Sequence, residues 1–259
     1  SGGLPVSSND SIKKIVTVAF ALCIVCSIVV STAAVILKPA QEANKDLDRK
    51  RNILAAAGML EEGRTVDELF ARIDARYVDL RTGEFAADVP DGYNQRAASK
   101  SPALSTDLED DPAKIGRRAD YAEVYLVQAA DGGLDKVILP IHGYGLWSTL
   151  YGFIALESDV NTVAGLGFYE HGETPGLGGE VDNPRWKSQW PGKQVYRDGE
   201  AAIALAKGGV DKQSPDAPWR VDGLSGATLT ARGVTNLVQF WLGEQGFKPF
   251  LDNLKTGDA

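Results

Sequence analysis

The sequence predicts an α+β protein in which an antiparallel sheet with packed helices follows a single transmembrane helix. Three observations predict this fold class. Residues 15–37 form one uncharged apolar run. From residue 121 onward, short alternating segments joined by short links are typical of antiparallel hairpins. After residue 228, apolar side chains recur at three- and four-residue steps, as on one face of a helix.

The apolar run is long enough to cross the roughly 30 Å hydrocarbon core of a bilayer. It is bounded by Lys13 and Lys14 on one side and by Lys38 on the other. A cleaved signal peptide is the main alternative, because residues 31–34 are small. The run continues past them to Leu37, however, which exceeds the about 7–15 residues of a signal core. A permanent anchor is therefore favoured.

The charges that flank the anchor leave its orientation open. Two lysines precede it, and five basic residues follow it, at Lys38, Lys45, Arg49, Lys50 and Arg51. This count would place the large domain in the cytoplasm. Large translocated domains often escape the rule, and acidic residues are interleaved with these basic ones.

Composition argues against two classes of function. The net charge is −8, and no block of Lys or Arg is long enough to follow a phosphate backbone, so nucleic-acid binding is not expected. Two Cys and two His are too few for a zinc or iron–sulfur site built from this chain alone. Cys23 and Cys26 share one face of the anchor, where packing is the expected role. We predict no metal site.

Between the anchor and the sheet, the pattern predicts helices and a loop. Apolar residues from Leu47 to Met59 indicate a helix after Pro39. Thr65 with Glu68 three residues later resembles a capping box and opens a second helix that runs through Ile73. Residues 97–112 are rich in Ser, Pro, Asp and Ala and are expected to form a loop.

The following segments are predicted as the sheet and its covering helix. Strands are expected at residues 121–128, 136–141, 147–156, 162–169 and 201–206, with turns at 131–133 and 157–161. A helix from Leu229 packs on the sheet, and residues 250–254 form a short final turn. This arrangement is α+β and not doubly wound.

The run from Asp222 to Thr228, Asp-Gly-Leu-Ser-Gly-Ala-Thr, is the strongest functional signal. It predicts a polar turn that ends in a hydroxyl at the start of a helix. Unpaired N–H groups and the positive end of the helix dipole favour a phosphate there. The alternative is that Ser225 or Thr228 simply caps the helix.

Three further features are candidates for ligand contact. The loop at residues 170–179 carries four glycines and Pro175, which allow close backbone approach to a flat ligand, although an empty hairpin loop is the alternative. Glycines around Tyr144 precede Trp147, which could line an apolar slot or belong to the core. Lys207, before Gly208 and Gly209, could neutralise a phosphate or simply be exposed. A base role for His171 beside Glu170 is not expected, because sequence neighbours on a strand point apart.

The Asp222-to-Thr228 run resembles the flavinylation signature D-x-x-[S/T]-G-A-T of proteins that carry FMN esterified to the Thr hydroxyl. Much of the chain is similar to the C subunits of the bacterial sodium-translocating NADH:quinone oxidoreductases. The resemblance is carried by residues 9–14, the anchor, and residues 136–140, 145–147, 173–179, 221–230, 240–243 and 249–251.

This resemblance implies FMN bound covalently to Thr228 by a separate flavin transferase that uses FAD. Backbone N–H groups of Ser225, Gly226 and Ala227 would bind the phosphate, and Asp222 would serve the transferase reaction or shape the turn. Thr174, Gly176 and Leu177 would line the ring with Trp147 beside it, and Lys207 would neutralise charge on the phosphate or the reduced ring.

The resemblance also implies a place in the cell. It indicates an electron relay within a six-subunit sodium-pumping complex of the bacterial inner membrane, with no complete active site in this chain. Residues 1–14 would be a short cytoplasmic N-terminus, 15–37 the transmembrane helix, 38–112 a helical and mixed segment, and 113–259 an FMN-binding domain facing the periplasm.

Two other functions are compatible with parts of the pattern. The G subunit of the related ferredoxin:NAD oxidoreductase has a similar anchor and flavinylation run, but the two ends of the chain favour the quinone reductase. A membrane-tethered extracytoplasmic binding domain without redox function would leave the Asp222-to-Thr228 run unexplained.

Overall fold

The computed structural model describes residues 12–257, so most of the expected N-terminal stretch 1–14 lies outside the described residues. The chain divides into two units, one ending at Asp48 and one beginning at Arg49, and each is described by itself. The mixed α+β fold with an antiparallel sheet is confirmed.

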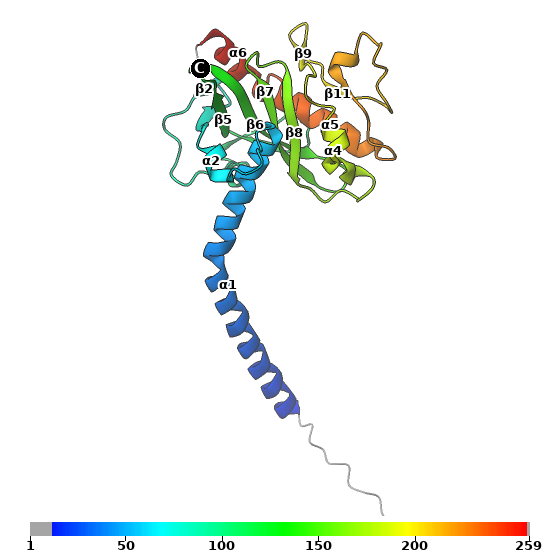
Figure 1. Ribbon diagram of the computed structural model, residues 1–259. Coiled ribbons are helices and arrows are strands. Elements are labelled where there is room, and N and C mark those ends of the chain that lie inside the picture. Colours follow the sequence, from blue (N-terminus) through cyan, green and yellow to red (C-terminus); the bar gives the residue numbers. More distant parts are fainter. Residues whose placement is uncertain (1–11, 258–259) are drawn as a thin grey trace, which may run out of the picture. The chain divides into compact units, whose positions relative to one another are not determined.

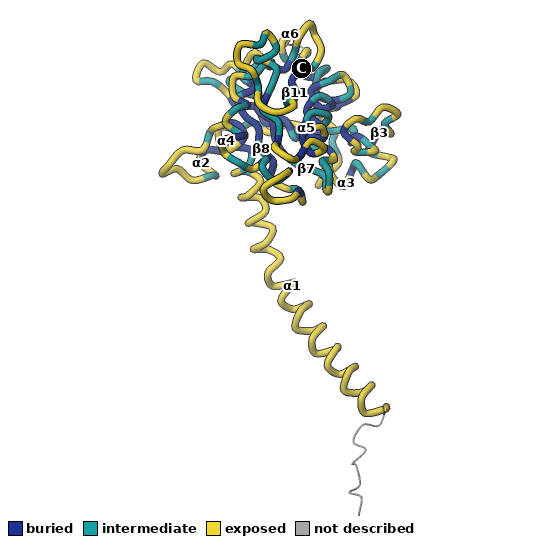
Figure 2. Tube along the Cα trace, turned by 90° about the vertical axis from the view of Figure 1, so that its right-hand side faces the viewer, coloured by how far each residue is buried: buried dark blue, intermediate teal, exposed yellow. Residues whose placement is uncertain are grey.

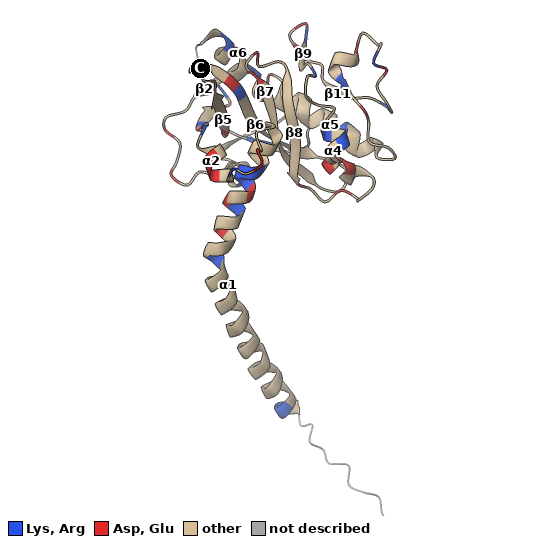
Figure 3. Ribbon diagram, viewed as in Figure 1, with Lys and Arg blue, Asp and Glu red and all other residues tan. Residues whose placement is uncertain are grey.

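Helix α1, Ile12–Ala56, contains the predicted apolar run. Its most apolar 18-residue window has a mean hydropathy of 2.7 and is entirely exposed, and its length and composition suit a membrane span. Figure 3 shows this stretch free of charged residues between those at its two ends. The helix continues through Pro39, so the helix predicted after this residue is present, as a continuation of the apolar helix. Proline removes one backbone donor, which a long helix can tolerate.

The second unit is built on a six-stranded sheet in the order β2-β1-β5-β6-β7-β8 (Figure 1). All of its neighbouring strands are antiparallel. The strands are β1 Ile73–Asp79, β2 Glu84–Phe85, β5 Tyr121–Gln128, β6 Leu134–Tyr144, β7 Thr149–Glu157 and β8 Val163–Glu170. The four hairpin strands predicted from residue 121 onward are therefore confirmed, with shifted ends.

Strand β1 was not predicted. The capping box at Thr65 is present, but its helix α2, Val66–Phe70, ends before Ile73. Residues 73–79 instead pair with all of the facing residues 121–127 of β5. A strand from the expected 38–112 segment thus lies inside the main sheet, so residue 112 does not separate two structural units. Local periodicity is ambiguous for so short a segment, and pairing with β5 decides its conformation.

Several smaller elements also differ from the sequence expectation. The loop at 97–112 contains the end of helix α3, Gln95–Ala98, and strand β3, Ser105–Asp107, which pairs with β4, Arg117–Ala119. The strand expected at 201–206 is two short pieces: β10, Glu200–Ala201, pairs with β9, Tyr196–Arg197, and β11, Ala204–Leu205, pairs with β12, Arg220–Val221. The final turn is a nine-residue helix, α6, Lys248–Thr256. The remaining elements are η1 Gly178–Asp182, α4 Pro184–Lys187, η2 Ala217–Trp219 and α5 Thr228–Trp241.

Alternating side chains of the sheet supply two apolar cores, and Figure 2 shows the buried residues gathered in the interior of the second unit. On β6, Val137, Leu139 and Ile141 belong to the larger core, which includes apolar residues of α5 and α6. Ile138 between them belongs to the smaller core on the opposite face, with Ile53 and other residues at the end of α1. Both faces of the central strands are therefore covered, and each is supplied by alternate residues, because successive side chains of a strand point to opposite faces.

Helix α5 lies unusually close to β6. A Cβ on Gly143 would lie 2.4 Å from the Cβ of Leu237, and one on Gly233 would lie 2.5 Å from the carbonyl oxygen of Tyr144. At the other end of the contact, the Trp241 indole donates a hydrogen bond of 2.6 Å to the carbonyl of His142. These contacts fix where the first turn of α5 begins.

The ring of His142 stacks on Tyr151 and lies against Trp241. Burial, and next the positive charge of Arg96, lower the pKa of His142 to about 4. The unfolded chain, with a His pKa near 6.5, therefore binds a proton that the folded chain rejects between these two values.

Acidification should consequently destabilise the protein. We expect the free energy of unfolding to fall by about 2 kcal/mol between pH 7 and pH 5 from this histidine alone. Denaturant titration of the detergent-solubilised chain at both pH values measures the change. His142→Phe keeps a stacked ring and should flatten the dependence; an equally steep dependence in this variant would contradict the assignment.

Candidate functional site

Thr228 is the first residue of α5, and its side chain is exposed. The run that precedes it forms a turn in which Gly226 has φ +70°. Ala227 occupies the N-cap position and supplies no side-chain hydrogen bond. Neither Ser225 nor Thr228 therefore caps the helix, and the alternative role considered from the sequence is not adopted.

The start of α5 consequently offers free backbone donors. Within residues 12–257, the N–H groups of Ser225, Gly226 and of residues 228–230 take part in no hydrogen bond with the protein. The N–H of Ala227, in contrast, donates to the carbonyl of Leu224 at 3.1 Å. Free donors at the positive end of a 14-residue helix are a favourable environment for a phosphate. Of the three residues expected to bind a phosphate through their N–H groups, Ala227 already donates its N–H within the protein.

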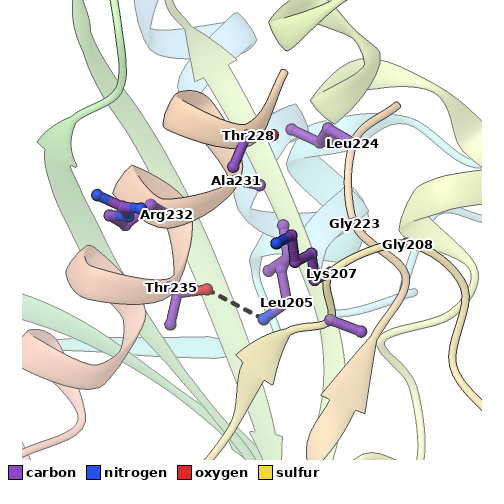
Figure 4. A pocket seen from close by; sticks show the side chains of 10 residues that line it. Leu205, Lys207, Gly208, Gly223, Leu224, Thr228, Ala231, Arg232 and Thr235 are labelled. Carbon is purple, nitrogen blue, oxygen red and sulfur yellow. Dashed lines mark hydrogen bonds between the residues drawn. The ribbon is translucent and has the colours of Figure 1, made fainter. Parts of the chain in front are cut away.

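A pocket of about 350 Å³ lies beside Thr228 (Figure 4). It is lined by Leu205, Ala206, Lys207, Gly208, Gly223, Leu224, Thr228, Ala231, Arg232 and Thr235. Lys207 follows β11, and its amine points toward α5, whereas the guanidinium of Arg232 points away from the pocket. The backbone N–H of Leu205 donates to Thr235 at 3.0 Å, which ties the end of β11 to the helix.

Asp222 shapes the turn on which this pocket depends. Its carboxylate accepts the N–H of Val210 at 2.7 Å, and its carbonyl accepts the indole N–H of Trp186 at 2.9 Å. The next residue, Gly223, donates to the carbonyl of Gly208 at 2.8 Å. A Cβ on Gly223 would lie 2.3 Å from the carbonyl oxygen of Ala206. These contacts hold the Lys207 turn against the Asp222-to-Thr228 run.

The glycine-rich loop lies next to the same run. A Cβ on Gly226 would be 3.0 Å from Cδ2 of Leu177, so this part of the loop contacts the turn before Thr228. Thr174 and Gly176 are exposed, and the carbonyl of Thr174 accepts the N–H groups of Leu177 and Gly179 in a tight turn. Leu177 is 44 % exposed, although it is apolar.

Trp147 is 67 % exposed and lies in the β6–β7 turn. The structure differs from the sequence expectation here, because β6 runs through Tyr144 and β7 begins at Thr149. The turn is thus residues 145–148, and Trp147 belongs to neither a strand nor the core. Leu177 on the glycine-rich loop and Leu229 on α5 are also exposed apolar residues. Exposed apolar side chains of this kind suit contact with the face of an aromatic ring.

Glu173 is a site residue that the sequence analysis missed. Its side chain is buried and accepts hydrogen bonds from backbone N–H groups of the Trp147 turn and from the hydroxyl of Thr230. An acidic residue in a polar loop carries no local sign of burial. Only the four glycines of the loop at residues 170–179 indicated that backbone segments approach each other closely there.

Glu170 and His171 do not form a catalytic pair. Glu170 binds Arg96 through two hydrogen bonds of 2.7 and 3.0 Å. His171 accepts the N–H of Glu173 through Nδ1 at 3.2 Å, so Nε2 carries the proton that it shares with Asp182 at 2.8 Å. This histidine is therefore engaged in local hydrogen bonds. In the described part of the chain, no group of three or more His, Cys, Asp or Glu could hold a metal ion.

Residues 145–243 match the FMN-binding domain family, a segment that includes Trp147, the glycine-rich loop, Lys207 and Thr228. The chain is 54 % identical to the C subunit of the Na(+)-translocating NADH-quinone reductase of Pseudomonas aeruginosa, over 98 % of this chain and 100 % of that protein. It is 51 % identical to the C subunit of the same enzyme from Vibrio anguillarum, over 97 % and 98 % of the two chains.

Two crystal structures have the same fold. NqrC of Shewanella oneidensis superposes with a TM-score of 0.77 at 39 % identity, covering 83 % of this chain and 99 % of the other. The C subunit of the Na(+)-translocating NADH-quinone reductase of Parabacteroides distasonis gives 0.64 at 28 % identity, covering 83 % and 96 %. The family expected from the sequence is thus confirmed: the chain belongs to the C subunits of the Na(+)-translocating NADH-quinone reductases.

Proposed function

We propose that this protein carries FMN bound through a phosphoester to the Thr228 hydroxyl and relays electrons within a sodium-pumping NADH:quinone oxidoreductase. The observation that carries the proposal is the exposed hydroxyl of Thr228 at an uncapped helix N-terminus, beside a pocket with a lysine pointing toward the helix. Membership of the family and the matched FMN-binding domain support the cofactor and the complex.

The phosphate is proposed to accept hydrogen bonds from the free N–H groups of Ser225, Gly226 and the first turn of α5. Lys207 adds a positive charge on the pocket side, and charge-assisted hydrogen bonds to phosphate are among the stronger ones in proteins. Asp222 acts by shaping the turn. Trp147 and Leu177, with Thr174 and Gly176, line the ring.

Bound FMN supplies one-electron oxidation and reduction, and the protein's own task is to hold the ring and exclude reactions other than transfer. Attachment at the phosphate leaves the ring itself unmodified. The reactions of NADH and quinone belong to other subunits of the complex, for which the family resemblance implies six in total.

Attachment requires a separate flavin transferase. The oxygen of Thr228 forms a bond to the FMN phosphorus of FAD, the pyrophosphate bond breaks, AMP leaves, and the hydroxyl proton passes to solvent or to a transferase base. An exposed side chain at the start of α5 is accessible to such an enzyme. Helix α1 serves as an inner-membrane anchor, and we propose that the large domain faces the periplasm.

Loss of the Thr228 hydroxyl should abolish covalent flavin. The Thr228→Ala variant, co-expressed with the transferase, is expected to give a band without flavin fluorescence on a denaturing gel, whereas Thr228→Ser should retain some. Thr256→Ala is the matched control, because it removes an exposed threonine hydroxyl that lies outside the run and the pocket lining and should stay fluorescent. A dark native band would refute the proposal and favour a tethered binding domain.

Removal of the Lys207 charge should slow flavin attachment. We expect Lys207→Gln to reduce the initial rate of FMN incorporation about tenfold, as the loss of one charge-assisted hydrogen bond implies. Lys212→Gln removes an equally exposed lysine outside the pocket lining and should leave the rate unchanged. Equal rates in the two variants would show that Lys207 does not contact the phosphate.

The orientation can be tested with one engineered thiol. Residue Glu62 is exposed, and the only native cysteines are Cys23 and Cys26 in the apolar part of α1. A Cys23→Ser, Cys26→Ser, Glu62→Cys variant should react with a membrane-impermeant maleimide in cells whose outer membrane alone is permeabilised. Labelling that appears only after the inner membrane is opened would place the domain in the cytoplasm.

A further inference from the structure

Three segments of the site meet at one buried carboxylate. Glu173 is 5 % exposed, and its two oxygens accept hydrogen bonds from the β6–β7 turn and from α5. The glycine-rich loop, which carries Glu173, is the third segment. We propose that Glu173 is a positioning residue that holds Trp147 and the glycine-rich loop in a fixed relation to the first turn of α5; its relevance to FMN rests on the function proposed above.

The hydrogen bonds divide between the two oxygens. Oε1 accepts the N–H groups of three consecutive residues, Leu146 at 3.1 Å, Trp147 at 3.0 Å and Ser148 at 3.2 Å. Oε2 accepts the hydroxyl of Thr230 at 2.6 Å and also the N–H of Leu146, at 3.3 Å. Thr230 is 1 % exposed and lies two residues after Thr228. A single side chain therefore connects the turn that carries Trp147 to the helix turn that carries Thr228.

Two glycines make this approach possible. A Cβ on Gly145 would lie 2.7 Å from Oε1 of Glu173, and one on Gly178 would lie 2.8 Å from Oε2. Any larger residue at either position would displace the carboxylate. The glycines at these two points therefore have a packing role around Glu173 in addition to their role in the turns.

The negative charge of the Glu173 carboxylate is stabilised by hydrogen-bond donors and not by a cation. No ion pair of Glu173 occurs among the salt bridges of residues 12–257. Burial by itself would raise its pKa, but the Thr230 hydroxyl and the amides of the Trp147 turn outweigh burial and hold the pKa below its usual value. The group thus stays ionised at neutral pH and keeps all of its acceptor sites.

Neighbouring contacts fix the loop on both sides of Glu173. The N–H of Gly172 donates to Oγ of Ser148 at 2.6 Å. His171 accepts the N–H of Glu173 and bonds to Asp182. The β6–β7 ladder itself is complete without these bonds, because it pairs every residue from Lys136 to Tyr144. The Glu173 network therefore orders exposed loops of the site, and the sheet does not depend on it.

The test compares two substitutions in the full-length chain in detergent. Glu173→Gln keeps the shape: its oxygen can accept the three amides, and its amide can donate to Thr230 if that hydroxyl turns to accept. Glu173→Ala removes every bond. Glu170→Ala, three residues earlier in the chain, is the matched control, because it removes an exposed carboxylate that binds Arg96. Thr230→Val removes one donor while keeping the side-chain shape and serves if Glu173→Ala does not fold.

The first readout needs no flavin. Hydrogen exchange of the amides of residues 146–148 should accelerate at least about tenfold in Glu173→Ala, because each loses its acceptor. Glu173→Gln should stay within about threefold of the native rate, and Glu170→Ala should not differ from it. Thr230→Val should give an intermediate rate.

The second readout uses the flavin-loaded chain. The visible circular dichroism of FMN reports how firmly its surroundings are held, and it should weaken about twofold or more in Glu173→Ala while the covalent flavin content stays equal. Glu173→Gln should keep the native band. Unchanged exchange and dichroism in Glu173→Ala, or a Glu173→Gln variant as impaired as the alanine, would overturn the positioning role. Absence of flavin from the native protein would refute the proposed function and leave the exchange test of Glu173 intact.

Discussion

The close contact between α5 and β6 fixes the start of the helix, to which the other segments of the site are tied. Gly143 and Gly233 let the helix approach the strand to a distance that no side chain would permit, and the indole of Trp241 closes the far end of the contact. A helix packed this tightly has little freedom to slide or rotate, because neighbouring atoms on both sides resist displacement. Its first residue is therefore held at a defined point beside the β11 end and the glycine-rich loop.

At the start of α5, several backbone N–H groups have no hydrogen-bond partner in the part of the protein that the structure describes, whereas at the start of some other helices a side chain accepts such a bond. The short helices α2, α3 and α4 are capped by the side chains of Thr65, Asn94 and Asn183. The longer helices α5 and α6 begin without such a cap, although a cap stabilises a helix by roughly 1 kcal/mol. At α6 a proline in the first turn removes one of the backbone donors. At α5 the free donors lie next to an exposed hydroxyl and a lysine, which is the pattern of a phosphate site.

The two sides of the site differ in how they are ordered. On the phosphate side, Asp222 and the tie between Leu205 and Thr235 hold the Lys207 turn. On the ring side, the buried carboxylate of Glu173 accepts hydrogen bonds from the β6–β7 turn and from α5. The apolar side chains of Trp147 and Leu177 remain exposed. Polar contacts beneath the surface thus position apolar groups on it, which suits a ligand that combines a charged phosphate with a flat ring.

The sequence by itself determined the long apolar helix, four hairpin strands, a helix that begins beside Thr228 and the family, because each depends on a local period or on adjacent residues. The sequence did not predict strand β1, because Ile73–Asp79 takes its conformation from pairing with β5 and not from its own pattern. The engagement of Ala227 and the role of Glu173 were decided only by the tertiary structure. Glu173 and Thr230 are 57 positions apart in the sequence and are hydrogen-bonded in the fold. No local sequence pattern predicts such a contact, because it results from the packing of α5 on the sheet.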